Sequence, residues 1–386
     1  MPRTTRKNHR MGHIDSIRGL AALLVVWIHT TSIFKKLQPP DGNGLLLYDV
    51  AQLFDFGRIG VLAFFAISGF VICPSLKGGR GSGAGKFVIS RFFRLYPAFW
   101  ASMIGAIVVL FILQGKKIDR DQVLGNIPIL YSFFDVMPLQ GLYWTLEIEL
   151  VFYFLCLDMF LFGVLHKPLA LFLACVCLMC FQNYLNTNPD LRQQITETFS
   201  RNWGRMPWHL AIMFWGGLFR IWYDDRRSVA TIWRIRIPNL LLVLVGLLLI
   251  LLQPFITIDR VIENGGGLKQ YGNMLAYILG MLLFIVGALY VRVNNPFFVW
   301  LGAISYSVYL FHPIAARLIG TAIKSKFPEY ADLHLGITLL LSTILTILMS
   351  ACVYYLIEKP SIQLGRMLQR KWFPPKRQSQ AVPLPL

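Results

Sequence analysis

The sequence predicts an all-α integral membrane protein, a single bundle of about ten transmembrane helices with both termini in the cytoplasm, and three observations support this class. First, 56% of the 386 residues are hydrophobic and only 15% are charged, whereas a soluble domain carries about 25% charged residues. Second, the mean hydropathy is +0.57. Third, the apolar residues form blocks of about 20, the length that crosses a bilayer as a helix. These blocks do not show the alternation expected of a membrane β-barrel.

Ten apolar blocks are expected to cross the membrane, each bounded by polar or basic residues. They cover residues 14–34, 56–76, 97–114, 144–163, 169–184, 207–222, 238–256, 271–291, 297–318 and 335–357. Residues 1–13 and 361–386 are then basic cytoplasmic tails on either side of one membrane domain, residues 14–360. With the N-terminus inside, the inner segments hold more Lys and Arg than the outer ones, as the positive-inside rule requires. An even number of spans returns the C-terminus to the same side.

The net charge of +18 fits this orientation and an attraction to the anionic lipids of the inner leaflet. The basic residues are scattered between spans and form no single face, which argues against binding to nucleic acid. All six cysteines lie in apolar blocks without the spacing of metal ligands, so neither a metal site nor a structural disulfide is expected.

The stretch Asp15–His29, DSIRGLAALLVVWIH, carries ionisable side chains into the first span. Arg18 and His29 are eleven positions apart, which on a helix is roughly 16 Å along the axis. If Arg18 lies at one face of the membrane, His29 lies near the middle of a hydrocarbon core about 30 Å thick. A charge at that depth costs about 2.5 kcal/mol or more. Two interpretations stay open: a neutral histidine hydrogen-bonded within the bundle, and a functional group.

The predicted inner loop 77–96, KGGRGSGAGKFVISRFFRLY, is rich in glycine and in basic residues. Its backbone is expected to approach an anion while the Lys and Arg side chains neutralise the charge. The spacing does not match a phosphate-binding P-loop, and no strand precedes it. Arg91 and Arg94 are three positions apart and share a helix face just before Pro97. They are candidates for binding phosphate, although arginines at this depth also serve as membrane anchors.

Polar side chains also enter the second and fourth spans. The stretch 60–70, GVLAFFAISGF, contains Ser68 among glycines that are typical of close helix contacts. The stretch 143–153, YWTLEIELVFY, brings Glu147 and Glu149 into or near lipid from the outer side. Because they are two positions apart on a helix, the two carboxylates point in different directions. Only one of them is expected to share a cavity with the histidine of the first span.

The ninth span contains the stretch 302–313, GAISYSVYLFHP, with two serines, two tyrosines and a histidine. Tyr306 and Tyr309 are three positions apart and lie on one face of the helix. Pro313 cannot donate a backbone N–H, so it frees a carbonyl one turn earlier and is expected to kink the helix. Glu358 ends the last span at the inner face.

In this order, the clusters resemble the acyltransferase-3 family of integral membrane acyltransferases over nearly the whole chain. The residues that carry the resemblance are Asp15, Arg18, Gly19 and His29, then Gly60 with FFAISGF, then Arg91, Arg94 and Pro97, then Trp144, Glu149, Phe152 and Tyr153, then SYSVYLFHP, and finally Glu358 with Pro360. Thr145 stands where serine is usual in the family, and Lys359 where arginine is common. Neither change removes an essential functional group.

The resemblance implies an enzyme that takes an acyl group from acyl-CoA on the cytoplasmic side. Acetyl, from acetyl-CoA, is the default acyl group of the family. The acceptor implied is a hydroxyl of a glycan, of a lipid-linked glycan or of another small molecule. The expected location is a bacterial inner (plasma) membrane, where such an O-acetyltransferase modifies polysaccharides of the cell envelope. No metal is expected.

Within that activity, the polar residues receive distinct roles. His29 is the candidate general base, with Glu149 orienting it or an acceptor hydroxyl. Arg18, Arg91 and Arg94 are candidates for binding acyl-CoA, because guanidinium groups match the geometry of phosphate. The candidate substrate-binding residues are Asp15, Ser68, Tyr143, Trp144, Tyr306, Tyr309 and His312. A structural role for Glu149, and interfacial anchoring by Tyr and Trp, stay open as alternatives.

Other mechanisms and functions stay open at this point. A covalent acyl intermediate on His29 or Ser68 would replace direct transfer. A secondary transporter or exporter of a small or glycan substrate would also have ten spans and polar groups in the membrane. It is expected to show two corresponding halves, and the sequence contains no such repeat. A non-catalytic membrane scaffold would explain the hydrophobicity but not the polar clusters.

Overall fold

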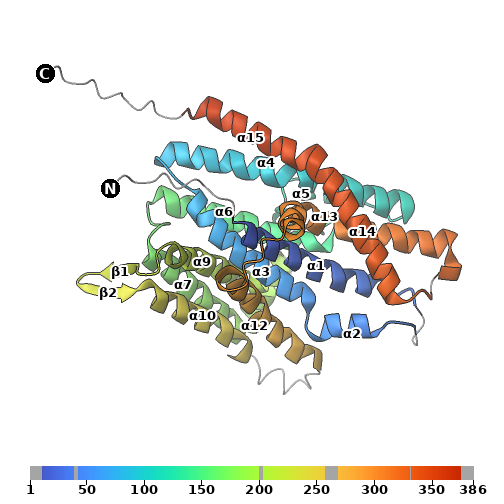
Figure 1. The fold of residues 1–386 in the computed structure, drawn as a ribbon, viewed down its shortest axis with the longest axis horizontal. Coiled ribbons are helices and arrows are strands. Elements are labelled where there is room, and N and C mark those ends of the chain that lie inside the picture. The colour runs from blue at the N-terminus through green and yellow to red at the C-terminus, as the bar shows by residue number, and fades with distance from the viewer. Residues whose placement is uncertain (1–10, 39–41, 200–202, 257–267, 331, 375–386) are drawn as a thin grey trace.

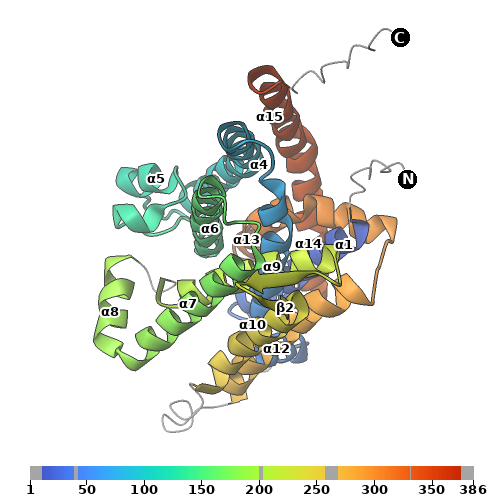
Figure 2. The ribbon, with the colours of Figure 1, turned by 90° about the vertical axis from the view of Figure 1, so that its left-hand side faces the viewer.

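A computed structural model describes residues 11–38, 42–199, 203–256, 268–330 and 332–374. The helices and strands are α1 (Gly12–Phe34), α2 (Leu46–Leu53), α3 (Phe56–Ile72), α4 (Arg80–Ile107), α5 (Arg120–Asn126), α6 (Trp144–Leu161), α7 (Pro168–Thr187), α8 (Pro189–Thr198), α9 (Met206–Asp224), β1 (Val229–Ile232), β2 (Ile235–Pro238), α10 (Asn239–Ile256), α12 (Leu268–Leu289), α13 (Pro296–Lys326), α14 (Leu335–Val353) and α15 (Lys359–Trp372). The long helices run side by side in one bundle (Figure 1), and the short helices α5 and α8 stand out at one side of it (Figure 2).

Eight described helical stretches are long and apolar enough to cross a bilayer by length and composition. They are Gly12–Phe34, Phe56–Ser75, Arg80–Leu113, Pro168–Thr187, Asn239–Ile256, Tyr271–Leu289, Pro296–Lys326 and Leu335–Trp372. The other two predicted spans coincide with α6 and α9, and α6 contains three acidic residues. The helical membrane class is therefore confirmed. The count of ten spans and the side on which the termini lie stay predictions.

The prediction of a loop over residues 77–96 is wrong for most of that stretch, because α4 begins at Arg80 and continues through Pro97. Glycines weaken an isolated helix, but Gly83 and Gly85 lie where another segment comes close. A Cβ on Gly85 would overlap the ring of Phe373, which follows α15. These two glycines therefore allow close packing, which Gly81 does not need, and the helix forms in spite of the low helix propensity of glycine. No flexible anion-binding loop is formed there.

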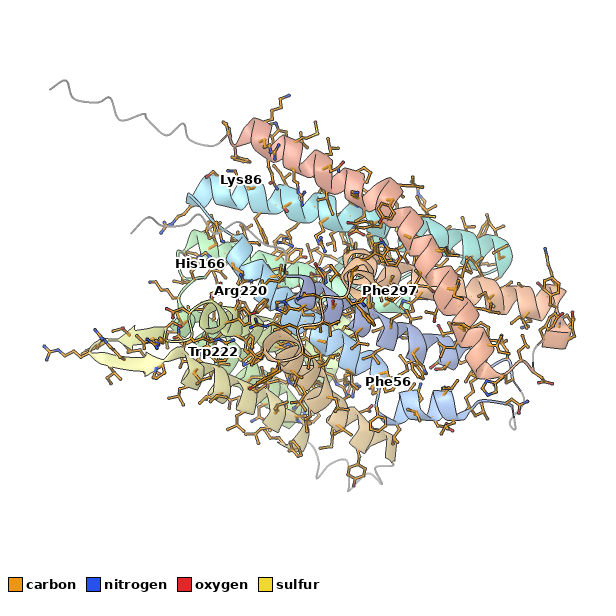
Figure 3. All side chains as sticks on the ribbon, in the orientation of Figure 1. Phe56, Lys86, His166, Arg220, Trp222 and Phe297 are labelled. Carbon is orange, nitrogen blue, oxygen red and sulfur yellow. The ribbon has the colours of Figure 1, made fainter. Side chains whose placement is uncertain are left out.

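Several elements were not predicted from the sequence, among them the short helices α2, α5 and α8, a β-hairpin and helix α15. Strands β1 and β2 form an antiparallel hairpin in which Val229 pairs with Pro238 and Ile232 with Ile235. Helix α15 occupies the first part of the predicted tail 361–386 and packs along α4 (Figures 1 and 2). The hairpin marks one end of the bundle. Figure 3 shows Lys86, His166 and Trp222 toward that end, whereas Phe56 lies toward the end that carries α2.

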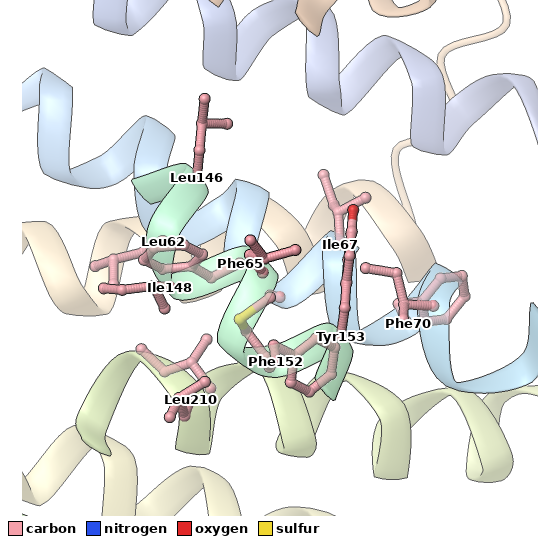
Figure 4. Packing of buried hydrophobic residues seen from close by; sticks show 14 of the residues in the cluster. Leu62, Phe65, Ile67, Phe70, Leu146, Ile148, Phe152, Tyr153 and Leu210 are labelled. Atoms are coloured by element: carbon pink, nitrogen blue, oxygen red, sulfur yellow. The ribbon is translucent and has the colours of Figure 1, made fainter. Parts of the chain in front are cut away.

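The core of the bundle is apolar and is built from helices that approach closely. Side chains of α3, α6 and α9 interlock in it, among them Phe65, Phe152 and Leu210 (Figure 4). A Cβ on Gly69 would overlap the backbone carbonyl of Met213 on α9. The interpretation of the glycines in the second span as helix contacts is thereby confirmed.

We expect Gly69→Ala to lower the free energy of unfolding by about 1–3 kcal/mol, because α3 and α9 must separate to admit the methyl group. Gly81→Ala is the matched control, since no atom lies within 4 Å of the position its Cβ would take. The measurement is thermal unfolding of the two variants in detergent. Equal unfolding temperatures would contradict the packing described.

Candidate active site

A cavity of about 300 Å³ lies among α1, α3, α4, α6, α13 and α15. Its lining residues are Arg18, Val61, Phe64, Phe65, Ile67, Ser68, Val71, Ile72, Ser90, Arg91, Arg94, Leu95, Thr145, Leu146, Glu149, Tyr153, Ser305, Tyr306, Tyr309, Ile362, Arg366 and Gln369. Four of them are arginines and one is a glutamate, so the cavity is strongly cationic. Much of the remaining lining is aliphatic or aromatic. Such a site suits a ligand with a polyanionic part and an apolar part.

The arginines of α4 are held by neighbouring side chains. Arg91 donates from Nη2 to Ser75 Oγ at 2.9 Å. Its guanidinium carbon lies 5.2 Å from the ring centroid of Phe87 and 5.5 Å from that of Tyr153. Arg91 Nε has no hydrogen-bond partner within the described residues. Arg94 follows one turn later on the same face of the helix, as the spacing predicted.

Glu358 is a buried carboxylate that interacts electrostatically with Arg94 and Arg18. It ends a π-helical turn, Tyr354–Glu358, that joins α14 to α15. Ser307 Oγ donates to Glu358 Oε2 at 2.8 Å, whereas Oε1 has no hydrogen-bond partner in the described part of the chain. The carboxylate thereby offsets part of the positive charge beside the cavity.

Glu149 is the acid inside the cavity. Its Oε1 accepts a hydrogen bond from Tyr153 Oη at 2.7 Å and a longer one from Ser68 Oγ at 3.4 Å. His29 is not among the residues that line this cavity. The structure therefore places the Glu149 carboxylate with the arginines and with Ser68, and its role toward His29 stays a prediction.

Glu147 has a different environment. Its carboxylate accepts hydrogen bonds from Ser132 N at 3.2 Å, Ser132 Oγ at 2.8 Å and Trp203 Nε1 at 3.2 Å. These bonds tie α6 to the segment before it and to the turn Trp203–Arg205, which precedes α9. The two carboxylates thus point in different directions, as their spacing predicted.

His29 lies beyond the cavity and faces His312. Its side chain is exposed, and the ring centroids of the two histidines are 5.2 Å apart. His312 is buried, and its ring centroid lies 5.9 Å from that of Tyr309. Tyr309 itself lines the cavity and donates from Oη to the Leu142 carbonyl at 3.2 Å. The tyrosine therefore connects the cationic cavity to the histidine pair.

The other predicted substrate-binding residues divide between the cavity and its surroundings. Tyr306 lines the cavity and donates to the Leu95 carbonyl at 2.8 Å. Asp15 is buried where α1 meets α13 and does not line the cavity. Tyr143 is buried and hydrogen-bonded to Ser102 and Gln140. Trp144 packs between Phe65 and His209. Neither Tyr143 nor Trp144 is part of the cavity wall.

Sequence reasoning missed the contribution of α15. Arg366 and Gln369 line the cavity, and Gln369 Nε2 donates to the Lys86 carbonyl at 2.8 Å. The signal was the spacing of Ile362, Arg366 and Gln369, which places all three on one face of a helix that starts at Pro360. Among the described residues, there is no group of three His, Cys, Asp or Glu side chains that could hold a metal ion.

A family model described as an acyltransferase domain matches residues 11–358, nearly the whole chain. The chain belongs to the acyltransferase-3 family. It is therefore a membrane acyltransferase of the class that moves groups other than aminoacyl groups. No match was found among curated proteins or among solved structures. The family match ends at Glu358, so the acyltransferase domain receives Arg366 and Gln369 from a helix outside the matched residues.

The two acids of α6 give a matched pair of variants. We expect Glu147→Gln to lower the free energy of unfolding by about 1–3 kcal/mol, because the amide nitrogen cannot accept the bonds that the carboxylate accepts. Glu149→Gln should leave stability nearly unchanged and lower acyl transfer. Thermal unfolding and transfer of label from acetyl-CoA, measured on both variants, check this. If Glu149→Gln lowered stability and Glu147→Gln lowered only transfer, Glu147 would be the functional acid and Glu149 the structural one.

Proposed function

We propose that the protein moves an acyl group, acetyl by default, from acyl-CoA to a hydroxyl of a glycan or lipid-linked glycan. His29 is the general base, and the enzyme works in a bacterial inner (plasma) membrane. The observation that carries the proposal is the cavity in which four arginines gather beside an apolar wall.

The donor fits this cavity by charge and by shape. Coenzyme A carries several phosphate charges at one end and a thioester at the end of a flexible arm. Guanidinium groups bind phosphate with two parallel hydrogen bonds, which an ammonium group cannot do. Arg18, Arg91, Arg94 and Arg366 approach from three helices and receive the phosphates. The apolar residues of α3 and α6 then face the arm and the acyl group.

The cytoplasm is the source of acyl-CoA, and the charge distribution supports an inner location for the cavity's arginine-rich end. Lys77, Arg80 and the arginines around the β1–β2 hairpin belong to segments at the end of the bundle where α4 begins. Positive residues flanking spans face the cytoplasm. The donor thus enters where α4 and α15 lie side by side, and the acceptor comes from the opposite face.

The acceptor meets His29, whose side chain is exposed. The acceptor oxygen attacks the thioester carbonyl carbon, the new C–O bond forms and the C–S bond breaks. The hydroxyl proton passes to the neutral imidazole of His29 and then to the leaving thiolate, which departs as the thiol of coenzyme A. Tyr309 lies between the cavity and the histidine pair, so the thioester arm has to pass this side chain.

We expect His29→Ala to lower acyl transfer by roughly 10²–10⁴-fold, the usual contribution of a general base. Membranes containing the full-length protein are incubated with [14C]acetyl-CoA, and label is counted in the glycan fraction. His166→Ala, which alters an exposed histidine outside the site, is the control. Transfer by His29→Ala at the wild-type rate would remove His29 as the base.

We expect Arg366→Gln to raise KM for acetyl-CoA by roughly tenfold, the loss of one charge-assisted hydrogen bond to phosphate, without lowering kcat. Arg370→Gln, on the same helix but outside the cavity lining, is the matched control. Steady-state kinetics with varied acetyl-CoA distinguishes the two. A fall in kcat with unchanged KM would show that α15 does not bind the donor.

A further inference from the structure

Helix α13 contains a proline in its interior, and the histidine before it binds the carbonyl that the proline leaves free. Pro313 has no backbone N–H, so the carbonyl of Tyr309, four residues earlier, loses its helical donor. His312 Nδ1 lies 2.7 Å from the oxygen of that carbonyl. This part of α13 is buried on both sides of the proline. An unpaired carbonyl there would be costly, and the histidine satisfies it.

The same hydrogen bond determines which ring nitrogen of His312 carries the proton. A carbonyl oxygen only accepts, so Nδ1 must carry a proton, and in a neutral imidazole Nε2 then carries the lone pair. His312 is 1% exposed, and its Nε2 has no hydrogen-bond partner within the described residues. A buried acceptor without a partner is uncommon in proteins. A hydrogen-bond donor is therefore expected to face Nε2.

His29 is the polar ring beside it, and Arg317, whose Nη1 has no hydrogen-bond partner within the described residues, also interacts electrostatically with His312. The ring centroids of the two histidines are 5.2 Å apart and their planes are inclined by 39°. This separation leaves room for a hydrogen bond between a ring nitrogen of His29 and His312 Nε2, made directly after a ring rotation or through one water molecule. His29 is exposed and His312 is buried. One ring is therefore exposed while the other is enclosed within the bundle.

We propose that His312 is a positioning residue for His29. Pro313 sets the tautomer of His312, because the carbonyl that it leaves free keeps the proton on Nδ1. Nε2 of His312 accepts the N–H of His29, which leaves the other nitrogen of His29 with its lone pair toward the acceptor hydroxyl. This inference rests on the proposed role of His29 as the base.

During transfer, the acceptor proton binds to that free nitrogen of His29. The positive charge is then shared with His312 through the hydrogen bond between the rings, and the Tyr309 carbonyl stabilises the far N–H of His312. When the thiolate of coenzyme A takes the proton, both histidines return to their starting tautomers. Proton and charge therefore balance over one turnover without another reactant.

Two substitutions of His312 distinguish its two hydrogen bonds. One is the bond that Nδ1 donates to the Tyr309 carbonyl, and the other is the bond that Nε2 is proposed to accept from His29. In His312→Asn, the amide nitrogen stands in for Nδ1 and keeps the bond to the Tyr309 carbonyl, but nothing replaces Nε2. In His312→Gln, the longer side chain places an amide oxygen near the Nε2 position. We expect His312→Asn to lower kcat roughly tenfold or more with KM for acetyl-CoA unchanged, and His312→Gln to retain more of the activity.

The assay uses membranes with the full-length protein and [14C]acetyl-CoA, and thermal unfolding is followed for each variant. Wild-type kcat in His312→Asn would overturn the inference. So would an equal loss of activity and thermal stability in both variants, because that pattern belongs to a structural role.

The tautomer is tested without any activity measurement. Protein labelled with 15N-histidine is compared by solid-state NMR with His312→Asn, which identifies the His312 signals by their absence. We expect the wild-type spectrum to show protonated Nδ1 and unprotonated Nε2. Pro313→Ala restores a backbone N–H that competes for the Tyr309 carbonyl, and should give a mixture of His312 tautomers. A wild-type His312 protonated at Nε2 alone would overturn the inference.

The result for His29 distinguishes this inference from the function on which it rests. If His29→Ala loses transfer while His312→Asn keeps it, the positioning role is wrong and the proposed function stands. If His29→Ala keeps transfer, His29 is not the base and the positioning role of His312 is wrong with it, whereas acyl transfer itself stands.

Discussion

The close contact between α1 and α13 is the interaction on which the rest of the site depends. A Cβ on Gly19 would lie 3.1 Å from Gly302 N, and one on Gly302 would overlap the backbone of Asp15. The two helices run in the same direction (Figure 1). Ten positions beyond this contact on each helix are His29 and His312, whose rings face each other. Two glycines thus set the register that brings the two histidines together, because parallel helices keep their offset over a few turns.

The interior of the bundle also follows from the need to satisfy polar groups away from water. Three hydrogen bonds hold Glu147, and Tyr153 with Ser68 holds Glu149. The atoms that lack such partners in the described chain include Arg91 Nε, Glu358 Oε1 and His312 Nε2. These three lie at or beside the cavity or in the histidine pair, whereas other such atoms, for example those of Gln182, Asn239 and Ser342, lie elsewhere in the bundle. Unpaired polar groups are costly in a membrane interior, so those that border the cavity are candidates for contact with a polar ligand.

The sequence predicted the helices well because a membrane span is a local property. An apolar run of sufficient length is visible without knowledge of its neighbours, and each predicted span coincides with a helix. Spacing within one helix was equally informative, as for Arg91 with Arg94. Contacts between distant segments were not accessible in this way. Only the folded chain shows that Phe373 packs on Gly85 or that α15 brings Arg366 to the arginines of α4.

The position of Tyr309 explains how one short motif can serve both halves of the site. Its side chain lines the cationic cavity and hydrogen-bonds to Leu142 and Thr145. Its carbonyl, freed by Pro313, binds His312 on the other side. A displacement of this one residue would change the wall of the cavity and the hydrogen bond that sets the histidine tautomer together. Tyr309 therefore couples the place where a donor binds to the place where a proton is taken up. The two substrates of this membrane enzyme come from opposite faces. Such a coupling would keep His29 in the tautomer of a base only while Tyr309 is in place in the cavity wall.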